Sequence, residues 1–154
     1  MERRHVELLI PPLAYLARAI VGIALIAAGT VKAIHPGTFV SDIWSYRLLP
    51  EDWAPWIAAF LPWLEIVAGA ALVTNRQRDG ARVIAALLLV VFLAALTQAW
   101  ARELDIACGC FGGAAPVNAG GANYAWLITR DLLLLGCLVF DRWVRRRTVC
   151  TKAA

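Results

Sequence analysis

Charged residues are scarce in this sequence, at 17% of its 154 residues, while hydrophobic residues make up 61%. An average soluble domain is about 45–50% apolar. A soluble fold of this composition would lack the polar side chains needed to cover its surface, whereas a fold embedded in a lipid bilayer does not need them. The composition therefore excludes an ordinary soluble domain and favours a membrane protein.

The sequence also has no Ser/Gly-rich linker, no low-complexity tract and no long repeat. Residues 1–154 are therefore expected to form a single transmembrane domain. The net charge is +4, but the basic residues lie at the ends of apolar runs, which is typical of membrane topology and not of a phosphate-binding face. We expect the lipid bilayer, and no nucleic acid, as a partner.

Four apolar segments are long enough to cross a bilayer, at residues 13–34, 53–74, 81–100 and 124–143. About 20 apolar residues in a helix span a hydrocarbon core of about 30 Å, and a helix satisfies its own backbone hydrogen bonds in lipid. The sequence therefore predicts an all-α polytopic fold, a bundle of four transmembrane helices. Aromatic residues near the segment ends would form an interfacial belt: Trp53, Trp56, Trp100, Tyr124 and Trp143.

The connection between the first two segments carries a pattern of its own. In "TFVSDIWSYRLLP", Phe39, Ile43 and Tyr46 recur at roughly helical spacing. A short amphipathic helix lying in the membrane interface would show this pattern. An irregular loop with buried aromatic side chains explains it about equally well.

Arginine and lysine residues are concentrated at the two termini and in the second of the three loops that connect the four segments. Basic residues at the N-terminus, in the second loop and at the C-terminus are Arg3, Arg4, Arg76, Arg78, Arg142, Arg145, Arg146, Arg147 and Lys152. The first and third loops carry one arginine each, Arg47 and Arg102. The positive-inside rule therefore predicts cytoplasmic N- and C-termini in the cytoplasmic (inner) membrane, with the first and third loops facing the periplasm.

This orientation separates the four cysteines. Cys150 falls on the cytoplasmic side, where thiols are kept reduced. Cys137 falls deep in the fourth segment and is expected to be a small apolar core residue. Cys108 and Cys110 alone face outward, in a compartment that permits disulfides.

The sequence "CGC" at residues 108–110 closes on itself only in a tight, strained ring, because a disulfide requires Cα atoms about 4.4–6.8 Å apart. Strained disulfides are easily reduced and tend to be catalytic or regulatory. Closing so short a loop also removes little unfolded-state entropy. We predict Cys108 and Cys110 as a catalytic thiol–disulfide pair. A structural disulfide, and a soft metal site completed by His35, remain alternatives.

Inside the apolar segments and away from their ends lie four charged residues: Arg18, Glu65, Arg130 and Asp131. Intramembrane charges usually face the bundle interior and pair with one another. We predict that Glu65 pairs with Arg18 or Arg130, that Asp131 makes a different contact, and that Lys32 snorkels to the interface. The four charges form either a polar clamp between helices or a polar floor for a quinone or a proton path.

Several stretches together resemble the MauE/DoxX family of small four-helix membrane proteins, and most closely its MauE (methylamine utilisation) branch. They are "RAIVGIALIAAGTVKAIHPGTF", "YRLLP", "LPWLEIVAGAAL" and "CGCFG", followed by "RD" at residues 130–131. The resemblance implies a four-helix bundle and a role in thiol redox or in the maturation of exported proteins. In the namesake system the partners are a thioredoxin-like periplasmic protein and a disulfide-rich methylamine dehydrogenase.

Two function hypotheses follow from these residues. In the first, Cys108 or Cys110 exchanges disulfides with a periplasmic thioredoxin-like protein that serves an exported client. No second cysteine pair lies in the membrane to relay electrons, so a quinone near Arg130 and Glu65 is the simplest acceptor, and no metal is assigned. In the second, the protein is a non-enzymatic assembly or export factor that binds an apoprotein, or a metal through Cys108, Cys110 and His35.

Overall fold

The computed structural model describes residues 2–74, 78–104, 106–107, 116–117 and 122–152 of the chain. Its elements, in order, are α1 (Glu2–Ile34), α2 (Pro36–Ser45), a short 3₁₀ helix η1 (Glu51–Trp53), α3 (Ala54–Val73), α4 (Arg78–Ala101), β1 (Ile106–Ala107), β2 (Pro116–Val117) and α5 (Ala122–Lys152). The predicted all-helical class is confirmed. Strands β1 and β2 were not predicted, because strands of two residues each are too short to show an alternating pattern.

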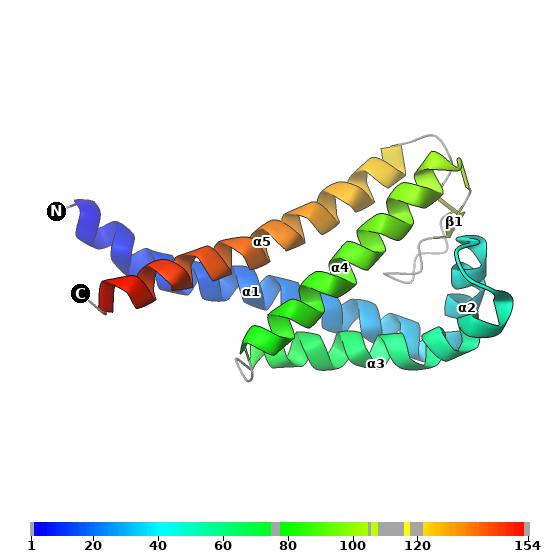
Figure 1. Ribbon diagram of the computed structural model, residues 1–154, viewed down its shortest axis with the longest axis horizontal. Coiled ribbons are helices and arrows are strands. Elements are labelled where there is room, and N and C mark those ends of the chain that lie inside the picture. Colours follow the sequence, from blue (N-terminus) through cyan, green and yellow to red (C-terminus); the bar gives the residue numbers. More distant parts are fainter. Residues whose placement is uncertain (1, 75–77, 105, 108–115, 118–121, 153–154) are drawn as a thin grey trace.

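The four long helices pack lengthwise. Helix α1 lies along α3 and α5, and α4 packs against α3 and α5. Both termini lie at one end of the molecule, while α2 and β1 lie at the other (Figure 1). The helices therefore bring the first and third connections, which are far apart in sequence, to the same end.

In the part of the chain that the structure describes, three helices are long and apolar enough to cross a membrane: Pro12–Ile34, Ala54–Val73 and Asp79–Ala101. They correspond to the first three predicted segments. Helix α5 continues without a break through residues 124–143, but charged residues within this stretch lower its hydropathy: Arg130, Asp131, Asp141 and Arg142. The chain is thus an all-α protein of membrane type, and α5 as a fourth span stays a prediction.

The amphipathic pattern between the first two segments forms a helix, α2, and the irregular-loop alternative is wrong. Pro36 stands in the first turn of α2, where its missing N–H leaves no internal hydrogen bond unmade. Phe39 and Asp42 are buried under α2, while Trp44 is exposed. Helix α2 therefore covers one end of the bundle with an aromatic and an acidic side chain.

Glycine residues allow α1 and α3 to approach closely. A Cβ atom added at Gly69 would lie 2.5 Å from the carbonyl oxygen of Gly22, and one at Gly29 would lie 2.6 Å from the carbonyl oxygen of Pro62. Real Cβ atoms do not approach backbone oxygen so closely. Small residues at such crossings let membrane helices pack backbone to backbone.

Apolar side chains fill the bundle between α1, α3, α4 and α5. The buried cluster comprises Val21, Leu25, Leu72, Ala81, Ala85, Leu89 and Leu138. Cys137 is half-buried, is not in a disulfide, and packs against this cluster, as predicted for a small apolar core residue. Large apolar side chains on the outside, such as Trp63 and Leu133, are exposed, as in a helix bundle that faces lipid.

We expect Gly69→Ala to destabilise the protein, because the new methyl group would force α1 and α3 apart. Overpacking of this kind costs about 1–3 kcal/mol. Gly136→Ala is the matched control, since a Cβ atom there meets nothing within 4 Å. Thermal unfolding of both variants in detergent measures the difference, and equal melting temperatures would contradict the close helix crossing.

Candidate functional site

The two strands bracket the Cys-Gly-Cys sequence. Strand β1 ends at Ala107 and β2 begins at Pro116, and they pair antiparallel with Ile106 opposite Val117. The predicted catalytic residues Cys108 and Cys110 lie outside the described residues. Strand β1 also contacts α2. The described ends of this connection are thus held together beside the helix that covers the bundle.

Side chains of α4 and α5 hold Leu104, which precedes β1, in position. The hydroxyl group of Tyr124, which is fully buried, donates a hydrogen bond of 2.5 Å to the carbonyl oxygen of Leu104. Tyr124 belongs to a cluster with Leu96, Ala99 and Leu127, against which Leu104 packs. The start of α5 and the end of α4 are therefore locked to the residues that lead into β1.

Glu65 forms an ion pair with Lys32, not with either predicted arginine. Lys32 Nζ lies 2.5 Å from Glu65 Oε1, and the exposed fractions of the two residues are 2% and 0%. The same Nζ lies 4.4 Å from the ring centre of Phe92 and 5.3 Å from that of Phe39. The prediction that Lys32 snorkels to the interface is wrong, because α2 places Phe39 over this end of α1.

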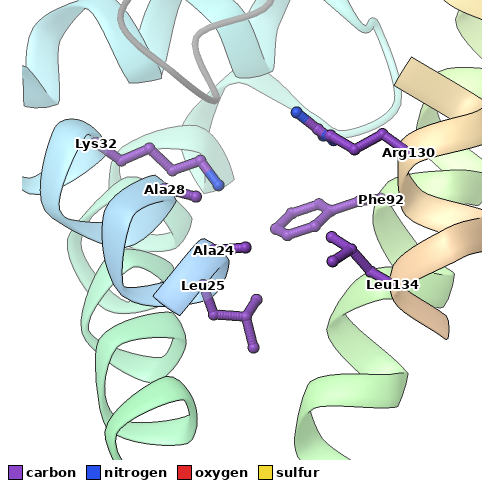
Figure 2. Close-up of a pocket in the computed structure, with 7 residues that line it drawn as sticks. All are labelled: Ala24, Leu25, Ala28, Lys32, Phe92, Arg130 and Leu134. Atoms are coloured by element: carbon purple, nitrogen blue, oxygen red, sulfur yellow. The ribbon is translucent and has the colours of Figure 1, made fainter. Parts of the chain in front are cut away.

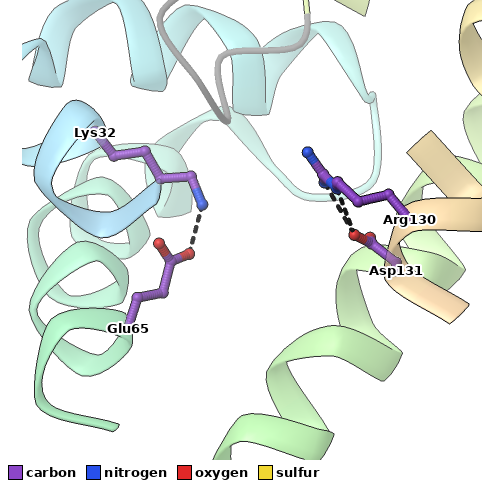
Figure 3. A network of polar contacts seen from close by, with 4 residues as sticks. All are labelled: Lys32, Glu65, Arg130 and Asp131. Atoms are coloured by element: carbon purple, nitrogen blue, oxygen red, sulfur yellow. Dashed lines mark hydrogen bonds and ion pairs between the residues drawn. The ribbon is translucent and has the colours of Figure 1, made fainter. Parts of the chain in front are cut away.

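Arg130 and Asp131 form a second ion pair across the bundle from the first (Figure 3). Both Arg130 Nε and Nη2 donate hydrogen bonds to Asp131 Oδ1, at 3.1 and 2.9 Å. The expectation of a different contact for Asp131 is therefore wrong. Adjacent helix positions differ by about 100° in direction, but the long arginine side chain folds back to reach its neighbour.

A small pocket separates the two pairs (Figure 2). It contains about 330 Å³ of space outside protein atoms, including its open mouth, of which about 30 Å³ admits the centre of a water molecule. Figure 2 shows that Lys32 and Arg130 extend into this space from opposite walls, with Phe92 between them. Apolar residues complete the lining: Ala24, Leu25, Ala28 and Leu134. The pocket suits a narrow, flat group or a few water molecules.

Arg18, the fourth predicted network residue, lies elsewhere. It is about 21 Å from Lys32 along α1, at 1.5 Å per residue, and thus out of reach of Glu65. Its Nη1 lies 4.0 Å from Asp141 Oδ1 on α5, and Arg82 Nε on α4 lies 2.6 Å from Asp141 Oδ2. Asp79 adds an exposed carboxylate 2.9 Å from Arg82 Nη1. The buried charges thus form two clusters at different heights along the bundle. One lies near α2 and contains the pairs Lys32–Glu65 and Arg130–Asp131, and the other lies nearer the termini and contains Arg18, Arg82 and Asp141.

Sequence reasoning missed Lys32, Arg82 and Asp141 as buried partners. All three are at most 6% exposed. The available signal was charge balance, because an arginine buried near the N-terminal end of the first apolar segment requires a carboxylate at the same height in the bundle. Asp141 is the carboxylate near the terminal end of the fourth apolar segment.

The described residues hold no group of three or more His, Cys, Asp or Glu side chains arranged for a metal ion. His35, the alternative ligand predicted beside the cysteines, lies between α1 and α2 and is exposed. It is therefore at the same end of the molecule as β1 (Figure 1).

Comparisons with known proteins identify a family. The family model "Methylamine utilisation protein MauE" matches residues 10–144. The methylamine utilization protein MauE of Paracoccus denitrificans is 31% identical over 134 residues, which cover 86% of this chain and 69% of that protein. The MauE of Methylophilus methylotrophus is 33% identical over 101 residues, covering 65% of this chain and 53% of that protein. No solved structure matches.

We expect Glu65→Met to destabilise the protein by about 3–5 kcal/mol, because it leaves the Lys32 ammonium group buried without its carboxylate. Adding Lys32→Met should restore most of the stability, since a buried ion pair replaced by apolar side chains of similar volume is often neutral. Glu65→Gln, which keeps an acceptor, should be milder than Glu65→Met. Thermal unfolding measures all three variants.

Arg130→Met is the control for this rescue. Combined with Glu65→Met it should add a further loss, because it strands Asp131 and leaves Lys32 unpaired. If Arg130→Met restores stability and Lys32→Met does not, the pairing described above is incorrect.

Proposed function

Because the chain belongs to the MauE family of methylamine utilisation proteins, we propose that it is an integral membrane thiol–disulfide redox protein for the maturation of exported proteins. The observation that carries this proposal is the Cys-Gly-Cys sequence at residues 108–110, between two paired strands. The names of its relatives favour a client in methylamine metabolism, such as methylamine dehydrogenase.

We place the protein in the cytoplasmic membrane with four spans, α1, α3, α4 and α5. An even number of spans agrees with both termini lying at one end of the bundle (Figure 1). The basic residues near those termini favour the cytoplasm for that end. Cys108 and Cys110 then belong to the periplasmic side, where a thioredoxin-like protein and its exported client are accessible.

The chemistry is reversible thiol–disulfide exchange. The thiolate of Cys108 or Cys110 attacks one sulfur of the partner's disulfide, that S–S bond breaks, and the partner's other sulfur leaves as a thiolate. The second cysteine then attacks the mixed disulfide and releases the partner as a dithiol. Two electrons pass from the cysteine pair to the partner, and the reverse sequence oxidises a partner dithiol.

The pocket between Lys32 and Arg130 is the proposed place for a quinone. Both side chains carry N–H donors suited to quinone oxygens, and Phe92 offers a flat wall to a ring. A bound quinone would supply an acceptor for two electrons and two protons. Glu65 and Asp131 hold the two donors in position through their ion pairs, whereas Arg18 is too distant to take part.

The topology has a direct test. An alkaline phosphatase fused after Ala154 should be inactive and a green fluorescent protein at the same place should fluoresce, because α5 returns the chain to the cytoplasm. After reduction, a membrane-impermeant maleimide should label Cys108 and Cys110 from the periplasm. A periplasmic C-terminus would leave three spans and remove the basis for α5 as the fourth.

The redox role is tested by trapping. Single variants Cys108→Ser and Cys110→Ser should differ, because one of them retains the attacking cysteine without the cysteine that resolves the mixed disulfide. That variant should accumulate a covalent complex with a periplasmic thioredoxin-like protein, detected on non-reducing gels and identified by mass spectrometry. Cys137→Ser is the control, since Cys137 packs in the bundle core.

Two results would favour the other function hypothesis. If Cys108 and Cys110 never form a disulfide in the native membrane, and their double serine variant still matures the client, the protein is an assembly factor without redox chemistry. A stoichiometric metal in the purified protein that is lost in His35→Ala would instead indicate a metal site. His35 is the exposed histidine between α1 and α2.

A further inference from the structure

The helices α1 and α5 extend together beyond the other two. Figure 1 shows both continuing past the end of α3 and the start of α4 toward the two termini. The close approach of Gly22 to Val73, the last residue of α3, places the end of α3 beside Gly22. The apolar span of α1 begins at Pro12, so the part of the extension nearest the bundle, which contains Leu13 and Leu16, still belongs to the segment that can lie in the hydrocarbon core.

Ion pairs of Asp141 hold α1, α4 and α5 together at the point where the extension begins. Asp141 on α5 binds Arg18 on α1 and Arg82 on α4, so three helices are tied together at the level where α4 begins. Beyond it, Ala14 on α1 and Val144 on α5 are both buried. The two helices thus remain packed on one another as they leave the bundle.

The outer part of α5 is strongly basic. Helix α5 runs unbroken to Lys152, and residues 142–152 contain five basic and no acidic residues: Arg142, Arg145, Arg146, Arg147 and Lys152. The chain has 15 basic and 11 acidic residues in all, so the rest of the protein is slightly acidic. The whole net positive charge therefore lies in the last three turns of one helix.

Apolar side chains keep this extension at the membrane. Leu13, Tyr15 and Leu16 on α1 are each about half exposed, at 53%, 50% and 54%. On α5, Trp143 is 47% exposed and stacks on Phe140, as an aromatic residue at a membrane interface does. Covering this apolar surface with lipid is more favourable than exposing it to water. The basic turns of α5, which directly follow Trp143, are therefore expected at the headgroup layer.

We propose that the extension formed by α1 and the basic end of α5 is a binding surface for acidic phospholipids. The headgroup phosphates of phosphatidylglycerol or cardiolipin would meet the arginines of α5 while the acyl chains cover Leu13, Leu16 and Trp143. Acidic lipids attract basic segments beside a membrane helix, each basic residue contributing about fivefold to binding. The surface lies at the opposite end from β1 and involves no cysteine chemistry.

The test compares two triple variants of the full-length protein, purified in a zwitterionic detergent. One is Arg145→Gln, Arg146→Gln and Arg147→Gln, and its control replaces the same three residues by lysine, which keeps the charge. Native mass spectrometry after incubation with equal amounts of phosphatidylglycerol and phosphatidylcholine measures the ratio of bound lipids. The wild type and the lysine control should prefer phosphatidylglycerol, and the glutamine variant should lose about tenfold or more of that preference.

Three results would overturn the proposal. These are a wild type without preference, a glutamine variant with the wild-type preference, and displacement of phosphatidylglycerol by heparin at equal phosphate or sulfate concentration, which would assign the surface to a soluble polyanion. Melting temperatures in the zwitterionic detergent establish that the variants fold. If the glutamine variant does not fold, Arg145→Gln with Lys152→Gln takes its place and should lose a smaller part of the preference.

Discussion

The backbone-to-backbone crossing of α1 and α3 is the constraint on which the interior of this protein depends. Gly22, Gly29 and Gly69 remove the side chains that would hold the helices apart. At this separation Lys32 and Glu65 lie within contact distance. A wider crossing would leave the carboxylate of Glu65 in an apolar interior without its cation, at a cost that membrane helices rarely tolerate. The glycines and the ion pair are therefore one structural unit.

The buried charges form two clusters, which lie toward opposite ends of the bundle. Near the termini, Asp141 joins Arg18 and Arg82 from two other helices, which makes that cluster a tie between helices. Below α2, each cation has its own carboxylate and both cations face a pocket. Among the described residues, the second cluster combines paired charges with space for a ligand. Sequence alone treated these residues as one network, because it could not assign them to levels.

The elements were predictable because hydropathy and length control them. The first three spans and α2 lie within a few residues of the predicted bounds, although α1 and α5 continue as helices beyond the apolar segments. The pairing of charges was not predictable. The sequence does not show at which height along the bundle each charge lies: α3 ends beside Gly22, which leaves Arg18 a turn beyond it. Lys32 was expected at the surface because nothing in the sequence shows that α2 folds over it.

Helix α2 connects the polar pocket to the connection that carries the cysteines. Its Phe39 contacts the ammonium group of Lys32, and its outer surface contacts β1, which ends one residue before Cys108. Helix α2 therefore lies between β1 and one of the two cations that face the pocket, and it contacts both. The presence of α2 is what makes a functional role for Lys32 and Glu65 physically reasonable, beyond their contribution to stability.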